Sequence, residues 1–98
     1  MSLQMNAEVE VFGEKFTVTN KDTFTWRDPL FIISSGGTSC FYRISTENFA
    51  AGDHKVYSID KFVNAEGKNF DSKNSPISVV TIQAKNEQGK DYGYRYYF

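Results

Sequence analysis

The residue types of a hydrolytic triad occur in one short stretch, where Asp53 and His54 precede Ser58. A triad needs a base within hydrogen-bond reach of a nucleophile, and an acid that orients the base. Adjacent residues of a strand point to opposite faces, so Asp53 cannot orient the ring of His54. We therefore interpret His54 as a surface residue at the start of a strand, and we predict no catalytic residue.

A second group of candidate ligands lies further along the chain. Asn64, Glu66, Asn69 and Asp71 supply four oxygen-bearing side chains around a glycine, which is the type of ligand that calcium prefers. Their spacing differs from that of a calcium-binding loop of the EF-hand type, and only two of the four are charged. The favoured interpretation is a plain connecting loop, with no metal and no cofactor.

The end of the chain is rich in tyrosine. Tyr92, Tyr94 and Tyr96 fall on one face of a predicted strand, and Tyr97 falls on the other. A buried aromatic row that pairs across strands is the structural interpretation. A flat platform for a sugar ring, a peptide or another subunit is the functional one. These four tyrosines form the candidate interaction surface, and which face is exposed stays open.

The elements that must position these residues are strands. Apolar residues alternate with polar ones over 7–11 and 16–20, and a short loop with Gly13 joins the two runs as in a hairpin. Further strands are expected at 24–26 with 30–34, 40–44, 54–59, 77–84 and 92–98. Turn residues recur about every ten positions, which predicts an all-β, immunoglobulin-like antiparallel β-sandwich of about seven strands.

The predicted core follows from this pattern. The run around Pro29 is apolar on both faces, as in a strand inside a sheet or under a covering loop. Pro29 predicts a bend or a strand edge there because it has no N–H. Cys40 is interpreted as a small buried residue. The residues expected to form the core are Val9, Val11, Phe16, Val18, Trp26, Ile32, Phe41, Phe62, Phe70, Val80 and Ile82.

Length and composition place these strands in one domain. The chain has 98 residues, of which 40% are hydrophobic and 16% aromatic, enough to fill one sandwich core. We assign residues 7–98 to this domain and residues 1–6 to an N-terminal extension, consistent with residues added for expression because Met5 follows Met1. The single cysteine is compatible with the cytoplasm or with an extracytoplasmic domain that lacks its signal.

Charge and hydropathy limit the classes of partner that we expect. Eleven basic and twelve acidic side chains leave a net charge of −1, so no overall field attracts a polyanion, and we expect no nucleic acid partner. No apolar run approaches the roughly 20 residues of a membrane helix, so we expect no membrane insertion. A protein partner or self-association is compatible with this composition.

Several strings of the sequence together resemble a known group of domains. They are NKDTFTW from Asn20, FAAGD from Phe49, IDKFVNAEGKNF from Ile59, and a terminal glycine- and tyrosine-rich segment. These strings resemble small bacterial immunoglobulin-like domains of uncharacterised function, the broad group that includes FxLYD-type envelope domains. The resemblance covers the chain from Thr17 onward. It implies an accessory domain, often extracytoplasmic or attached to a membrane anchor, without assigned catalysis.

The sequence therefore predicts a non-catalytic protein-interaction or structural module of a bacterial protein. A packed sandwich of this size leaves little volume for an enclosed pocket, so activity would lie on a face, an edge or the loops. The alternative is a carbohydrate-binding domain that uses exposed aromatic residues and loop carboxamides. An enzyme built on His54 and scattered carboxylates is the third possibility, and it would need those carboxylates to converge in a cleft.

Overall fold

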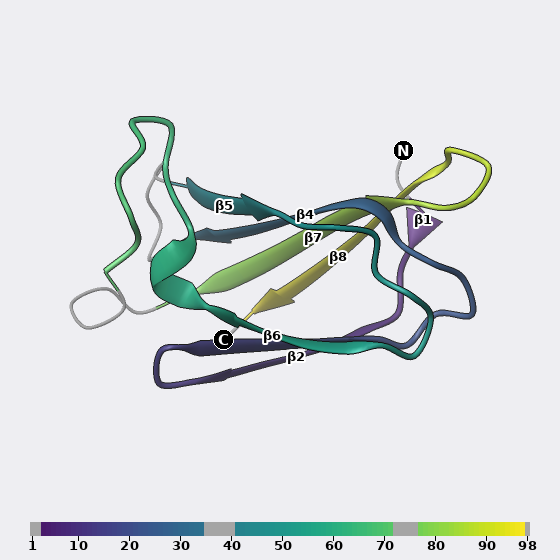
Figure 1. Cartoon of the computed structure of the whole chain (residues 1–98), viewed down its shortest axis with the longest axis horizontal. Helices are drawn as coiled ribbons and strands as arrows, with labels where there is room; N and C mark the ends of the chain where they lie inside the picture. Colours follow the sequence, from purple (N-terminus) through teal and green to yellow (C-terminus); the bar gives the residue numbers. More distant parts are fainter. Residues whose placement is uncertain (1–2, 35–40, 72–76, 98) are drawn as a thin grey trace.

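The computed structural model describes residues 3–34, 41–71 and 77–97. Their strands form two sheets that pack face to face, as Figure 1 shows. The strands are β1 (Leu3–Gln4), β2 (Ala7–Phe12), β3 (Lys15–Asn20), β4 (Arg27–Ser34), β5 (Phe41–Ser45), β6 (His54–Ser58), β7 (Val79–Lys85) and β8 (Asp91–Tyr97). The predicted all-β sandwich is confirmed.

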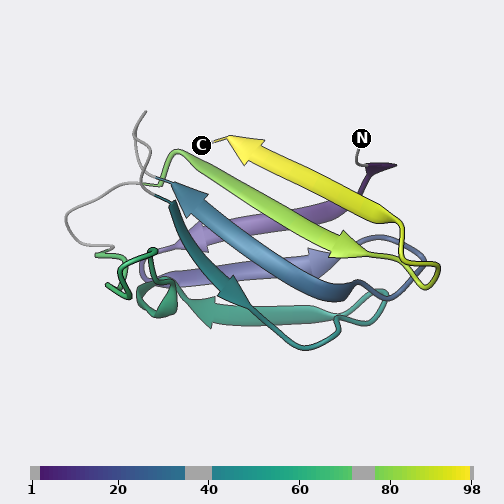
Figure 2. The ribbon, with the colours of Figure 1, turned by 90° about the horizontal axis from the view of Figure 1, so that it is seen from above.

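The larger sheet has the strand order β1-β8-β7-β4-β5, and the smaller one has the order β2-β3-β6. All neighbours are antiparallel except β1, which pairs with β8 in parallel. The chain passes from the smaller sheet to the larger between β3 and β4, returns between β5 and β6, and crosses again between β6 and β7 (Figure 2). A single 3₁₀ turn, η1 (Ile59–Lys61), follows β6, where the sequence suggested more strand.

The predicted hairpin is confirmed, because β2 and β3 pair from Ala7 with Asn20 to Phe12 with Lys15. Alternation places one face of this hairpin against the larger sheet, which buries Val9, Phe16 and Val18. The buried apolar residues are Met5, Val9, Phe16, Val18, Trp26, Phe31, Ile33, Phe49, Ile59, Phe62, Phe70, Val80, Ile82 and Ala84. Val11, which we also expected inside, is only partly buried.

Two predicted core residues point outward instead. Ile32 lies opposite Arg43 on the outer face of the larger sheet, and Phe41 is 47% exposed. Phe41 lies opposite Ser34 on that outer face. For Ile32 the reason is a β-bulge near Pro29: Arg27 and Leu30 lie three positions apart in β4, while their partners in β7 lie only two positions apart. The extra residue shifts the phase of the strand, so that Phe31 and Ile33 are buried and Ile32 faces outward. Pro29 thus lies at an irregularity of the ladder, and not at a sheet edge, because β4 lies between β7 and β5.

Asn20, at the end of β3, is fully buried and joins three segments by hydrogen bonds. Its side-chain Nδ2 donates to the carbonyl oxygens of Phe24 and Phe49, each at 3.0 Å, and its Oδ1 accepts from the backbone N–H of Asp22 at 2.9 Å. Asp22 in turn accepts a bond from the indole Nε1 of Trp26 at 2.9 Å. A buried amide is tolerated only when its polar atoms are satisfied, and here they are.

The segment assigned to an N-terminal extension contacts the sheet directly. β1 pairs with Tyr92 and Gly93 of β8, and Met5 is fully buried. The backbone N–H of Met5 donates to the carbonyl oxygen of Gly93 at 3.1 Å. Residues 3–5 therefore extend the edge of the larger sheet. The predicted turn at 35–38, Cys40 and Phe98 lie outside the described residues.

Replacing Asn20 by aspartate tests the hydrogen-bonded corner. Asn20→Asp removes both donors and sets a carboxylate against two carbonyl oxygens, so we expect about 2–4 kcal/mol less free energy of unfolding in urea. Asn48→Asp is the matched control, because exposed Asn48 acts as an acceptor for the N–H of Asp28, which aspartate preserves. We expect a change within about 0.5 kcal/mol for this control. Equal unfolding midpoints for the two variants would contradict this role of Asn20.

Candidate functional site

The β7–β8 register separates the four candidate tyrosines into two groups. Tyr92, Tyr94 and Tyr96 lie opposite Ala84, Ile82 and Val80, which are buried, so this row faces the smaller sheet. The rings of Tyr92 and Phe24 have centroids 4.7 Å apart, and Tyr92 and Tyr94 are half-buried against the core. The structural interpretation therefore describes Tyr92 and Tyr94 well.

Tyr97 and Tyr96 are the two tyrosines that present large exposed areas. Tyr97 is 68% exposed on the outer face of the larger sheet, and Tyr96 is 37% exposed at the rim of the core-facing row. Arg95, which precedes them, is exposed on the same outer face as Tyr97. The last three described residues of β8 thus bring aromatic area to both sides of the strand.

The outer edge of β8 is covered over only part of its length. β1 pairs with Tyr92 and Gly93, and the carbonyl of Gly93 points outward to accept the N–H of Met5. In an antiparallel pair alternate residues direct their backbone groups to opposite edges, so the N–H and C=O groups of Arg95 and Tyr97 also point outward. Within the described chain no strand pairs with this half of the edge (Figure 2).

Two other sheet edges of the described residues, those of β5 and β2, are less suited to receiving a strand. β5 is covered at Arg43, which exchanges two backbone hydrogen bonds with Val63, at 2.8 and 3.2 Å. β2 carries exposed Glu8 and Glu10, and charged side chains on an edge oppose strand addition. β8 carries a single charge among tyrosines over its uncovered half. This half of β8 thus combines open backbone groups with a single charge.

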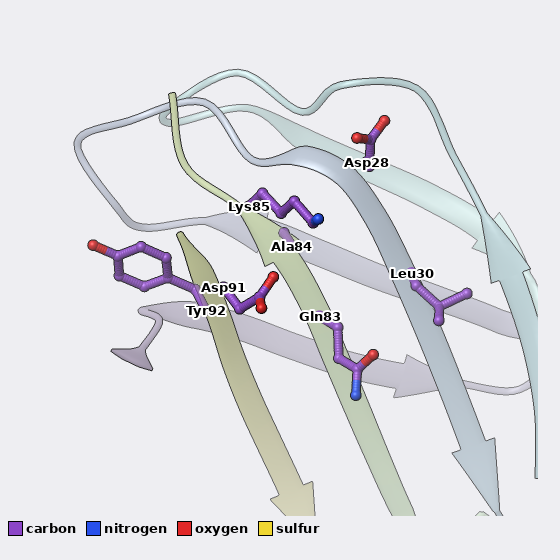
Figure 3. Close-up of a pocket in the computed structure, with 7 residues that line it drawn as sticks. All are labelled: Asp28, Leu30, Gln83, Ala84, Lys85, Asp91 and Tyr92. Atoms are coloured by element: carbon purple, nitrogen blue, oxygen red, sulfur yellow. The ribbon is translucent and has the colours of Figure 1, made fainter. Parts of the chain in front are cut away.

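A shallow groove of about 330 Å³ lies at the opposite end of the β7–β8 ladder, on the outer side of the larger sheet (Figure 3). Its chemistry comes from two carboxylates, an ammonium group and an amide. The residues that line it are Asp28 and Leu30 from β4, Gln83, Ala84 and Lys85 from β7, and Asp91 and Tyr92 from β8. The ring of Tyr92 points away from Lys85 and Asp91, so it borders the groove rather than flooring it.

The bulge in β4 shapes this groove. Asp28 lies within the bulge and has a φ of 50°, a left-handed conformation that is uncommon for residues with a side chain. Its backbone N–H donates to Oδ1 of Asn48 at 3.2 Å. A smaller hollow of about 190 Å³ adjoins the groove and shares Asp28 and Lys85 with it. Bulges often redirect side chains next to binding sites.

His54 does not form a triad-like arrangement with Asp53 and Ser58. The carboxylate of Asp53 accepts the backbone N–H of His54 at 2.9 Å. The ring Nδ1 lies 3.1 Å from Oγ1 of Thr19, the residue directly opposite on β3. Ser58 lies at the far end of β6.

The loop that offered calcium ligands is built as a turn. Oδ1 of Asn64 accepts the backbone N–H groups of Glu66 and Lys68, each at 2.9 Å. The amide of Asn69 donates to the carbonyl of Asp60 at 2.7 Å. The same pattern recurs at 86–90, where Oδ1 of Asn86 accepts two N–H groups at the same distance. The sequences NAEGK and NEQGK therefore encode one turn type.

The described residues contain no group of three or more His, Cys, Asp or Glu side chains placed to hold a metal ion. They also contain no helix of the length and apolarity needed to span a membrane.

No family model matches the chain, and no curated protein matches it.

The positive φ of Asp28 gives a test of the bulge. Asp28→Val should lower the free energy of unfolding by about 1–2 kcal/mol, because a β-branched residue strongly disfavours the left-handed region. Asp28→Gly should leave stability within about 0.5 kcal/mol of the parent, since glycine adopts that conformation freely. Urea unfolding measures both. A valine variant as stable as the glycine variant would show that this residue adopts ordinary extended backbone.

Proposed function

We propose that this chain is a non-catalytic interaction module that binds an extended segment of a partner protein along the uncovered half of β8. The observation that carries this proposal is the outward-facing carbonyl of Gly93 at the end of β1, from which alternation directs the Arg95 and Tyr97 backbone groups outward as well. A strand added there would gain main-chain hydrogen bonds, which supply affinity without requiring a particular sequence.

The side chains around this edge would supply selectivity. Residues of an added strand alternate between two faces, and each face of β8 presents a tyrosine at its rim. Tyr97 contributes aromatic area on the outer face and Tyr96 on the other. Tyrosine offers a large contact area at small entropic cost, so the edge favours a partner segment with apolar or aromatic residues on both faces.

The strand order also supports an immunoglobulin-like assignment. The smaller sheet, ordered β2-β3-β6, would correspond to strands A, B and E of that architecture. In the larger sheet β4, β7 and β8 would correspond to strands C, F and G, with β5 as an additional strand beside C. The resemblance to small bacterial envelope domains of the FxLYD-like group is part of the same proposal. Both support an accessory domain that presents or recognises protein. With a net charge of −1, nucleic acid is not the partner that we expect.

Two substitutions at one position test strand addition. Arg95→Pro removes the outward N–H and leaves the bonds to β7 intact, because that N–H faces away from β7; proline is tolerated at such edges. Arg95→Ala removes the same guanidinium and keeps the N–H. Random peptides displayed on phage are selected on the parent chain and then measured by calorimetry.

We expect the selected peptides to bind the alanine variant within about threefold of the parent, and the proline variant at least about tenfold more weakly, because main-chain bonds supply the affinity. Circular dichroism and urea unfolding check that both variants fold. Equal binding to the two variants, or no peptide selected at all, would contradict strand addition at this edge.

A second candidate function, carbohydrate binding, is favoured by the groove at the bulged end of the sheet. Gln83, Asp28 and Asp91 offer hydrogen-bonding groups to sugar hydroxyls in an open hollow, and Tyr92 borders it. The groove would recognise a polar neutral ligand through hydrogen bonds more than through stacking, because the ring points aside.

A glycan array tests this candidate. If the groove binds sugar, Gln83→Ala and Asp91→Ala should each lower the affinity for a glycan that the array identifies by about tenfold, the cost of a lost hydrogen bond to a polar ligand. Tyr97→Ala, at the other end of the ladder, is the control and should leave glycan binding unchanged. An array without signal would exclude this function for the glycans that it displays.

A further inference from the structure

We propose that two copies of this chain pair through the uncovered halves of their β8 strands, antiparallel and related by a two-fold axis next to Tyr96. This inference rests on the proposed strand-adding role of β8 and names its partner as a second copy. The larger sheets of the two copies would then form one continuous sheet across the dimer.

The edge itself selects this register. Hydrogen-bonded pairs in an antiparallel ladder form between residues whose backbone groups point to the shared edge, and here these are Arg95 and Tyr97. Placing Arg95 opposite Tyr97 of the second copy uses both residues of each strand and gives four backbone hydrogen bonds. Gly93 is already bonded to Met5 and stays outside the pairing.

Two other registers are possible, and each is worse. Centring the axis on Arg95 sets Arg95 against Arg95 of the second copy, and like charges directly opposite are destabilising. It also brings Tyr97 against Gly93 of the second copy, where β1 already pairs. Centring the axis on Tyr97 uses one residue of each described strand and halves the hydrogen bonds.

The favoured register also matches the side chains. On the outer face each guanidinium of Arg95 would lie beside the ring of Tyr97 of the second copy, and both residues are exposed in the single chain. An Arg–Tyr contact of this type adds a cation–π attraction. On the other face the two copies of Tyr96 would meet at a non-hydrogen-bonded position, where side chains approach most closely.

The interface is short, so the dimer should be weak. Only three residues of each strand take part, so the area that they bury is well below that of a standard stable interface. We expect a monomer at low micromolar concentration and a rising average mass at several hundred micromolar, in the range of weak complexes. Sedimentation equilibrium measures this, and Arg95→Pro should abolish the rise.

Engineered cysteines in a Cys40→Ser background test the register directly. In the Tyr96→Cys variant the new cysteine should cross-link to the same cysteine of the second copy, because non-hydrogen-bonded pairs have Cα atoms about 4.5 Å apart, within disulfide range. Arg95→Cys and Tyr97→Cys should each fail to cross-link alone and should cross-link when mixed. Val56→Cys, exposed on the smaller sheet, gives the background rate of random oxidation.

We expect the Tyr96→Cys chain to cross-link at least about tenfold faster than the Val56→Cys chain, since pairing raises the effective concentration, and this excess should vanish in urea. Self-cross-linking of Arg95→Cys or Tyr97→Cys above background, or no excess for any variant, would overturn the two-fold pairing. If the pairing fails while selected peptides still distinguish Arg95→Pro from Arg95→Ala, strand addition stands with a different partner. If both fail, the proposed function fails as well.

Discussion

The fold depends on one buried amide. Asn20 ends β3 inside an apolar core, and its side chain satisfies the carbonyls of Phe24 and Phe49 and the N–H of Asp22. Its backbone also bonds to Asp53 and Gly52 ahead of β6. One residue therefore fixes the crossing from the smaller sheet to the larger and the return into β6. A buried polar network of this type specifies a single arrangement, because any alternative leaves a donor or acceptor unsatisfied.

Much of this fold could be predicted from alternation. The hairpin of β2 and β3 is predictable because it has one buried face, and a one-residue slip would expose its apolar set. Strand β7 is predictable from its β-branched residues. Ile32 was misplaced because β4 is apolar on both sides, so alternation carries no information there. The bulge near Pro29 then decided which side is inner, and a bulge depends on pairing with β7 rather than on local sequence.

The candidate sites were less predictable, for two physical reasons. The tyrosine strand was recognised by residue type, but which tyrosines are exposed depends on its register with β7. The groove joins residues of β4, β7 and β8 that lie far apart in sequence, and only the Asp28-Pro29 pair gave a local signal of irregular backbone. Backbone groups on an open edge carry no sequence signature, because every residue other than proline supplies them.

The groove and the open edge occupy opposite ends of one ladder, and β1 separates them. The groove lies where Lys85 pairs with Asp91, and the open edge ends where Val79 pairs with Tyr97. These pairs lie six positions apart along each strand, a distance of about 20 Å at 3.4 Å per residue. A strand added beside Arg95 would therefore stop at β1 and leave the groove accessible. Because β1 is held by the buried Met5 side chain as well as by backbone bonds, it limits the length of any added strand, and the two surfaces can act independently.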